Sequence, residues 1–369
     1  MTSSVNSTDD LEHYLNDKKF NKIFILCGKK SFKNSGIEKF FGNLLKSKKT
    51  KFFFKTSPIP ILNELKKIII EIRNFKPDLI LAVGGGTIID YAKIANVVEL
   101  KNNLKDLIIN YSYPFSTKFT KLAVIPTTAG SGAEVTSNAV IYVDKIKYSF
   151  ESKLLIPDIF FLLPEFLISA PNQIKASSGF DAIAQALESL ISKKSNSESI
   201  GFATKSLELS INNYILFLDN PNLKNAATMS VASNLAGKAI NITKTTAPHA
   251  ISYPFTSLFN ISHGHAVSLF FENFFKFNFD NLEKSETNFN LKERFDLIFK
   301  IFNVGDIIQF NSKISSIKKI AKLEDDLKVL NIDIINSSEK IIKGINALRL
   351  NNNPVKIDEN SIYNIITKI

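Results

Sequence analysis

The first half of the chain alternates short apolar runs with stretches of helical spacing. Residues 22–28 (KIFILCG) form a continuous apolar run that ends in glycine, which is typical of a buried parallel strand. The alternation continues to about residue 170 and predicts a doubly wound, parallel α/β sheet. The pattern predicts strands at 22–28 and 51–57, helices at 7–15, 35–49 and 61–75, a strand, glycine turn and helix over 78–96, and a strand followed by a polar turn over 121–137.

From residue 174 onward the helical spacing is continuous and few strand signals remain. Such a pattern predicts an all-α domain. We therefore expect two domains, an α/β domain over residues 1–172 and a helical domain over residues 173–369. The clearest helical stretches are residues 179–192, 197–216 and 225–240.

The hydropathy and cysteine content of the chain indicate the cellular compartment to expect. The chain has 369 residues, 44% of them hydrophobic, and no apolar run reaches the roughly 18 residues that span a bilayer. The first residues are polar and lack the apolar core of a signal peptide. Cys27 is the one cysteine, so no internal disulfide can form. We therefore expect a cytoplasmic protein that does not associate with membranes.

The net charge of +11 raises the question of nucleic-acid binding. Lysine supplies nearly all of this charge, since arginine occurs only at Arg73, Arg294 and Arg349. The lysines are scattered along the chain, whereas a nucleic-acid surface needs them clustered. The charge therefore favours small anionic substrates rather than nucleic acid.

Two turns rich in small residues follow successive predicted strands. Residues 84–90 (GGGTIID) open a helix, and the glycines let backbone N–H groups approach an anion such as a dinucleotide pyrophosphate. Residues 126–137 (PTTAGSGAEVTS) follow the next strand, and ligands bind at the carboxyl ends of strands in such sheets. The usual GxGxxG fingerprint is absent, and glycines also form tight turns without a ligand. The two turns together favour cofactor binding.

Three of the four histidines lie within residues 249–265. His249 and His263 are separated by a proline and a turn, so two helices are able to bring them to one ion. Two imidazoles together with a carboxylate suit Zn²⁺ or Fe²⁺. The alternative is that these histidines are buried and make structural hydrogen bonds.

A carboxylate lies near the start of a predicted helix in the second domain. Asp181 and Gln185 are one turn apart on the same face of that helix, which Ser177 or Ser178 is expected to cap. Asp181 is a candidate metal ligand. A simpler interpretation is that its negative charge favours the amino-terminal end of the helix.

Four motifs occur in the order and spacing of a known family: GGGTIIDYAK, PTTAGSGAEVTS, GFDAIAQALES and HAISYPFTSLFNISHGHA. Over essentially its whole length the chain resembles the iron-containing (group III) alcohol dehydrogenases, whose fold is shared with dehydroquinate synthase-like cyclases. The resemblance implies a Rossmann-like amino-terminal domain, a helical carboxyl-terminal domain and an active cleft between them. It also implies NAD(H) or NADP(H), one divalent metal ion (Fe²⁺ or Zn²⁺) and a homodimer.

The resemblance implies which residues bind the metal ion, and the chain differs from the family pattern at one of these positions. Asp181, His249 and His263 match ligand positions of the family, and His249 and His263 are thereby the expected catalytic residues. Gln185 lies where most members have histidine. An amide oxygen is a weaker donor than imidazole, so either Gln185 is a fourth ligand at reduced affinity or the site is metal-free.

The resemblance also assigns the cofactor residues. The pyrophosphate is expected at the glycine turn, and the second turn lines the rest of the groove. After the first strand, where the family often has an acidic residue that selects NAD(H), the chain has Lys29 and Lys30, which makes NADP(H) acceptable. The expected cofactor-binding residues are Gly28, Lys29, Gly84, Gly85, Gly86, Thr87, Asp90, Thr127, Thr128, Ser131 and Val135.

Within the family, residues 240–266 look most like the branch that reduces phosphonoacetaldehyde to 2-hydroxyethylphosphonate in phosphonate metabolism. A phosphonate needs cations and hydrogen-bond donors, and the expected substrate residues are Lys244, Thr245, Thr246 and His265. Three alternatives stay open: another aldehyde or alcohol substrate within the family, a metal-free family member, and a cyclase-like lyase.

Overall fold

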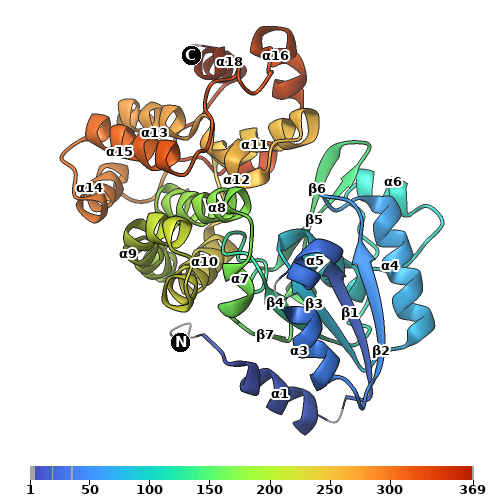
Figure 1. Ribbon diagram of the computed structural model, residues 1–369. Helices are drawn as coiled ribbons and strands as arrows, with labels where there is room; N and C mark the ends of the chain where they lie inside the picture. The colour runs from blue at the N-terminus through green and yellow to red at the C-terminus, as the bar shows by residue number, and fades with distance from the viewer. Residues whose placement is uncertain (1–4, 19, 35, 368–369) are drawn as a thin grey trace. The chain divides into compact units, whose positions relative to one another are not determined.

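The computed structural model describes residues 5–18, 20–34 and 36–367, and the chain divides into two compact units (Figure 1). No helix of these residues is long and apolar enough to cross a membrane. Unit 1 comprises Met1–Ala170 and Pro221–Asn234, and unit 2 comprises Pro171–Asn220 and Leu235–Ile369.

One segment departs from the expected domain division. The expected boundary between residues 172 and 173 lies next to the observed one between Ala170 and Pro171. Residues 221–234, however, group with unit 1 rather than with the helical domain. A buried hydrogen bond explains this, because the side-chain amide of Asn234 donates to the carboxylate of Glu134 at 2.8 Å.

Unit 1 is built on a parallel sheet with strand order β2-β1-β3-β4-β7, as the alternating pattern predicts. Alternate residues of β1 enter two separate hydrophobic clusters, Phe24 and Leu26 on one face and Ile23 and Ile25 on the other. Both faces of β1 are therefore covered, which is why its sequence is a continuous apolar run. The strands are β1 (Lys22–Gly28), β2 (Lys49–Lys55), β3 (Leu79–Gly84), β4 (Lys121–Pro126) and β7 (Ile159–Phe160).

Helices cover the two faces of this sheet. Residues of α4, α5 and α6 join the cluster that contains Phe24, and residues of α1, α2, α3 and α7 join the cluster that contains Ile23. The helix bounds are α1 (Thr8–Asp17), α2 (Lys29–Asn34), α3 (Ile37–Leu44), α4 (Leu62–Phe75), α5 (Gly86–Val97), α6 (Leu104–Ile109) and α7 (Glu165–Ile168), with a short 3₁₀ helix η1 (Lys153–Leu155). Helix α1 is capped by Ser7, in a capping box with Asp10.

An antiparallel hairpin in unit 1 was not predicted from the sequence. Strands β5 (Asn138–Val143) and β6 (Ile146–Glu151) pair between β4 and β7 along the chain. The two turn residues, Asp144 and Lys145, have φ of 50° and 68°. A two-residue hairpin turn of this kind is usually marked by glycine, and its absence here leaves the sequence without the signal.

The secondary-structure elements named in the described part of unit 2 are all helices, and Ser285 and Val355 form one isolated antiparallel bridge. Its longest buried element is α8 (Asn172–Ile191), whose residues from Gly179 to Ile191 are all buried. The remaining helices are α9 (Ser197–Asp219), α10 (Leu223–Thr243, which begins in the segment of unit 1), α11 (Ala247–Phe259), α12 (His263–Ser268), α13 (Phe271–Asp280), η2 (Leu282–Lys284), α14 (Leu291–Phe302), α15 (Ile307–Ile320), α16 (Ile334–Lys343), α17 (Ala347–Leu350) and α18 (Glu359–Thr367).

The expected cap of α8 is wrong. The helix begins at Asn172, directly after Pro171, so Ser177 and Ser178 lie inside it. The apolar stripe starts only about two turns into the helix, and the earlier turns carry no hydrophobic signal. Instead of capping α8, the Ser177 hydroxyl accepts the backbone N–H of His265 at 3.1 Å.

Candidate functional site

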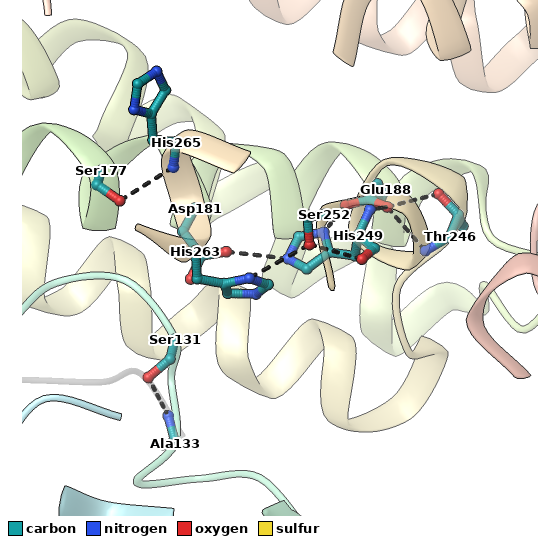
Figure 2. A network of polar contacts seen from close by, with 10 residues as sticks. All are labelled: Ser131, Ala133, Ser177, Asp181, Glu188, Thr246, His249, Ser252, His263 and His265. Atoms are coloured by element: carbon teal, nitrogen blue, oxygen red, sulfur yellow. Dashed lines mark hydrogen bonds and ion pairs between the residues drawn. The ribbon is translucent and has the colours of Figure 1, made fainter. Parts of the chain in front are cut away.

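Three side chains of unit 2, two of them buried and that of His263 half-buried, converge at one point (Figure 2). Asp181 comes from α8, His249 from the first turn of α11, and His263 from the start of α12. Each offers one ligand atom, and these three atoms lie within 4.8 Å of one another. The structure thus brings together the carboxylate and the two imidazoles that the sequence singled out.

A glycine permits the close approach of α12 to α8. Gly264 lies between His263 and His265, and a β-carbon at this position would be 1.9 Å from the backbone oxygen of Ser177 and 2.9 Å from the β-carbon of Asp181. Any larger residue would push α12 away from α8. Gly264 therefore keeps His263 within reach of Asp181.

Glu188 is a functional residue that the sequence interpretation missed. It lies two turns after Asp181 on α8, is fully buried, and its carboxylate pairs with Nδ1 of His249. The same carboxylate accepts the backbone N–H and the hydroxyl of Thr246 at 2.9 and 2.8 Å. With Nδ1 engaged, Nε2 of His249 faces Asp181 at 3.0 Å. The seven-residue spacing from Asp181 on an apolar helix is the signal that would have indicated it.

The carboxylates of Glu188 and Asp181 favour the protonated, positively charged form of His249. Burial lowers the pKa of His249, but Glu188 and Asp181 outweigh this effect and raise the pKa to about 10. Burial raises the pKa of Asp181, but the hydrogen bond from His249 and the charges of His249 and His263 outweigh burial and hold that pKa below its usual value. A metal cation bound among these side chains would likewise stabilise the two negative charges.

Gln185 supplies the test of whether a metal ion fits. The side chain is 3% exposed, one turn after Asp181, and Asp181 accepts a hydrogen bond from it. Its other polar atom, Oε1, is buried and has no hydrogen-bond partner among the described residues. Leaving such an oxygen unsatisfied costs about 1–3 kcal/mol, and a divalent ion would satisfy it. Two imidazoles, a carboxylate and an amide oxygen therefore fit Zn²⁺ or Fe²⁺.

The two small-residue turns of unit 1 lie together at one edge of the sheet. Strands β3 and β4 are neighbours, with Gly84 in register with Pro126. The backbone N–H of Thr127 donates to the carbonyl oxygen of Gly84 at 3.1 Å. Both turns therefore leave the carboxyl ends of adjacent strands, where ligands bind in open α/β sheets.

The glycines of the first turn have a packing role as well. A β-carbon on Gly85 would lie 3.1 Å from the Thr128 hydroxyl, and one on Gly86 would lie 2.9 Å from the Ser131 hydroxyl. A side chain at either position would therefore force the facing hydroxyl side chain of the second turn to move. No side chain caps α5 at Gly85, so the first N–H groups of a twelve-residue helix are available for an anion. The cradle fits a pyrophosphate.

Other expected cofactor residues have structural partners. Asp90 is buried and accepts the backbone N–H of Val140 at 3.2 Å, and burial raises its pKa to about 6 despite the charge of Lys93. These contacts hold Asp90 within unit 1, and its expected role in cofactor binding stays a prediction. The Thr87 hydroxyl donates to the carbonyl oxygen of Pro58 at 3.2 Å.

The remaining expected cofactor residues lie at or near the carboxyl end of the sheet. Gly28 is the last residue of β1, which pairs with β3, and the exposed Lys29 begins α2. The half-buried Val135 lies near the end of the second turn, and its N–H donates to the carbonyl oxygen of Gly132.

The four expected substrate residues all make hydrogen bonds with other residues of unit 2. The hydroxyl and N–H of Thr246 both go to Glu188, and the backbone oxygen of Thr245 accepts from the side-chain amide of Asn352 at 3.0 Å. The His265 ring points away from His263, with Nε2 against the backbone oxygen of Glu324 at 2.7 Å (Figure 2). These contacts fix the positions of Thr246 and His265, and their role toward the substrate stays a prediction.

Lys244 has an unusual backbone conformation. It follows α10 with φ of 60°, and its ammonium donates to the carbonyl oxygen of Asn241 at 3.3 Å. The side chain is half-buried. Of the four expected substrate residues, Lys244 is the one that brings a positive charge within five residues of His249.

Comparison with known proteins gives several similar chains. The chain is 29% identical over 259 residues to the 1-propanol dehydrogenase PduQ of Citrobacter freundii and 31% identical over 217 residues to the 4-hydroxybutyrate dehydrogenase of Clostridium kluyveri. The matches cover 69% and 58% of this chain, and 66% and 58% of those relatives. The chain thus matches less than two thirds of the length of these curated relatives.

Two solved structures share the fold. The archaeal Red Sea brine pool alcohol dehydrogenase ADH/D1 bound to NZQ has a TM-score of 0.89 at 20% identity, over 100% of this chain and 97% of that chain. The sulfoacetaldehyde reductase from Bifidobacterium kashiwanohense in complex with NAD⁺ has a TM-score of 0.87 at 23% identity, over 100% and 96%.

The family models account for nearly the whole sequence. Residues 2–164 match the iron-containing alcohol dehydrogenase model, and residues 175–369 match the C-terminal model of Fe-containing alcohol dehydrogenases. The parallel sheet, the glycine turn and the Asp–His–His cluster agree with these matches. This chain therefore belongs to the iron-containing alcohol dehydrogenases, a family of oxidoreductases.

Proposed function

We propose that this protein reduces small aldehydes to alcohols with NADH or NADPH. The observation that carries the proposal is the convergence of Asp181, His249 and His263 at one point. On the same helix as Asp181, Oε1 of Gln185 is buried without a hydrogen-bond partner among the described residues. In the reaction, a hydride adds to the carbonyl carbon and a proton to the carbonyl oxygen. The aldehyde, the reduced cofactor and one proton thus yield the alcohol and the oxidised cofactor.

Side chains of unit 2 would hold the metal ion. Asp181, His249, His263 and Gln185 form the donor set, and Glu188 orients the ring of His249 through Nδ1. When bound, a divalent ion supplies a Lewis acid for the carbonyl oxygen, and the nicotinamide supplies the hydride.

Residues of unit 1 would bind the dinucleotide. The N–H groups of Gly86 and Thr87, in the uncapped first turn of α5, would bind the pyrophosphate. Thr127, Thr128 and Ser131 belong to the adjacent turn and offer hydroxyls at the same edge of the sheet.

The basic residues after β1 allow the cofactor preference to be tested. Lys29 and Lys30 are exposed and follow β1 directly, where they would attract a 2′-phosphate. We expect Lys29→Glu to raise KM for NADPH more than KM for NADH, measured side by side at low salt because screening weakens such contacts. An equal change in both KM values would count against NADP(H) selection by this residue.

As the substrate we propose phosphonoacetaldehyde, which would be reduced to 2-hydroxyethylphosphonate. Three observations support an aldehyde that carries an anionic group. The chain has a net charge of +11, Lys244 lies close in sequence to His249, and a relative is named for 4-hydroxybutyrate, which also carries an anion on a short chain. The second candidate is an uncharged aldehyde such as propanal, favoured by the name of the 1-propanol dehydrogenase relative.

A substrate panel tests the proposal. Oxidation of NADPH and NADH would be followed with phosphonoacetaldehyde, propanal and lactaldehyde, before and after chelation and metal readdition. We expect the highest kcat/KM with phosphonoacetaldehyde and loss of turnover on chelation. A higher kcat/KM with propanal would favour the uncharged substrate. Absence of any net cofactor oxidation would favour a lyase or a binding protein.

The variant Lys244→Asn tests whether the ammonium group of Lys244 binds the phosphonate of the substrate. Asparagine tolerates the positive φ of this position better than most residues. If the ammonium binds the phosphonate, kcat/KM for phosphonoacetaldehyde should fall roughly 10- to 150-fold, as expected for a lost charge-assisted hydrogen bond. Propanal serves as the matched control, since it has no anion. Equal losses on both aldehydes would assign Lys244 to the fold.

A further inference from the structure

A fully buried ammonium in unit 1 has no role in the metal site or the pyrophosphate site proposed above. Lys93 is on α5, 0% exposed, and its Nζ contacts oxygens from one short segment of chain. It donates to the backbone oxygens of Ala133 at 2.9 Å, Thr136 at 2.7 Å and Asn138 at 2.6 Å, and it lies 3.1 Å from the Thr136 hydroxyl.

This arrangement is an oxygen cage around a cation. Three carbonyl dipoles from six successive residues point at one atom, and without a positive charge between them they would repel one another. Residues 133–137 belong to no helix or strand, so these carbonyls of Ala133 and Thr136 have no ladder of backbone partners. Burial of an ammonium is itself costly unless it is fully hydrogen-bonded. The segment and the cation therefore depend on each other.

The caged residues 133–137 form the later part of the second small-residue turn, which spans residues 126–137. The N–H of Ala133 donates to the Ser131 hydroxyl at 3.4 Å, and Gly132 between them has φ of 57°. At its other end the turn is tied to the sheet, because Thr127 donates to Gly84. The position of the turn is thus set at one end by the strands and at the other by Lys93.

The helix that carries Lys93, α5, begins in the first small-residue turn (residues 84–90), where the pyrophosphate is proposed to bind. Gly86 begins α5 and packs against the Ser131 hydroxyl, and Lys93 lies two turns farther along the helix. Helix α5 therefore connects the proposed pyrophosphate site at its first turn with the oxygen cage around Lys93, which holds the second small-residue turn.

We propose that Lys93 is a positioning residue for the dinucleotide, an internal cation that fixes residues 133–138 and thereby the turn that carries Thr127, Thr128 and Ser131. The inference rests on the proposed function, since it concerns how the same cofactor is bound. Lysine suits the task because its compact ammonium has three donors that rotate to meet backbone oxygens. Backbone carbonyls in proteins surround monovalent cations in a similar way.

The test measures cofactor affinity in the absence of metal. The dissociation constant for NADPH would be determined by nicotinamide fluorescence for the parent and for Lys93→Met, which keeps the aliphatic stem and removes the charge. We expect at least a tenfold weaker affinity in the variant. Lys318→Met is the matched control, because Lys318 is 2% exposed and belongs to unit 2, where Glu272 and Asp325 surround it. Its loss should lower the melting temperature without weakening NADPH binding.

A rescue experiment separates an internal cation from ordinary packing. In Lys93→Ala, ammonium chloride should restore at least a threefold gain in NADPH affinity, because the ammonium ion matches the cage. Tetramethylammonium chloride at the same concentration cannot donate hydrogen bonds and should have no effect. Equal responses to the two salts, or none to either, would overturn the inference.

The remaining outcomes are also decisive. If Lys93→Met binds NADPH as tightly as the parent, the inference is wrong. If that variant does not fold, Thr136→Val takes its place, because it removes one of the four oxygens around Lys93 with little change in shape. We expect it to weaken NADPH binding about threefold, and an unchanged affinity would overturn the inference. A parent protein that binds neither NADPH nor NADH would instead refute the proposed function.

Discussion

The carboxylate of Glu188 pairs with Nδ1 of His249 and thereby turns Nε2 of the same ring toward Asp181. Glu188 lies two helical turns from Asp181, so one face of α8 supplies both the candidate metal ligand and the group that orients its neighbour. Carboxylate–histidine–metal arrangements of this kind raise the basicity of the imidazole and fix its tautomer.

Glu188→Gln should weaken metal binding while the fold is kept. The amide retains the shape of the side chain and still accepts from Thr246, but it no longer brings a negative charge to His249. Loss of such a partner typically costs 10–100-fold in affinity. Zinc titration calorimetry on the chelated protein would measure the change. Glu272→Gln is the control, as Glu272 is also a buried glutamate of unit 2 but pairs with Lys318. Equal zinc affinity in the parent and Glu188→Gln would contradict the orienting role.

Gln185→His should raise the affinity for Zn²⁺ by about tenfold or more, because imidazole is a better donor than an amide oxygen. Gln185→Leu should lower it, because the leucine side chain offers no donor atom at all. Competition with a chromogenic chelator would measure both. The same affinity in the parent and in both variants would place the Gln185 amide outside the ligand set.

Gly264→Ala should both destabilise the protein and weaken the metal site. The added methyl group meets the backbone oxygen of Ser177, which cannot rotate away, so α12 must shift and carry His263 with it. Overpacking of this kind costs about 1–3 kcal/mol or more. Urea unfolding and zinc titration would measure the two effects.

Gly201→Ala is the matched control for that substitution. Gly201 lies within α9, and a β-carbon there would meet nothing within 4 Å. Alanine at an open helical position should stabilise the protein by about 0.5–1 kcal/mol. If Gly264→Ala were as stable as the parent, the close packing of α12 on α8 would not be what positions His263.

Asp90→Asn should change the dependence of stability on pH. Burial raises the pKa of Asp90 from 3.8 to about 6. Between these values the folded protein binds a proton that the unfolded chain has already lost, so the contribution of Asp90 to stability is lost as the pH rises through this window. An asparagine mimics the protonated form, and the variant should be more stable than the parent above pH 6 by about 2–3 kcal/mol. Urea unfolding of both proteins from pH 4 to pH 8 would test this, and a constant difference across that range would contradict it.

Hydrophobic periodicity alone predicts much of the fold. A run such as Lys22–Gly28 is buried on both faces and can only be a central strand, and the observed β1 has these bounds. The amphipathic spacing of α4 likewise matches the predicted helix to within one residue. Features without a local signal were missed. The β5–β6 turn lacks glycine, and the first turns of α8 carry no apolar stripe.

The order of residues in the chain determined which chemical groups this protein has: two small-residue turns after successive strands, a carboxylate and amide one turn apart, and histidines close together in sequence. Periodicity places such groups on a helix or strand, because the backbone repeat is local. Only the tertiary structure decided which of them meet. Glu188 is 61 residues from His249, and the carbonyls around Lys93 come from 40 or more residues away. Contacts at that separation depend on how the elements pack, and a local pattern does not encode them. This is why the contacts of Thr246 with Glu188 and of His265 with the backbone of Glu324 were not predicted from the sequence.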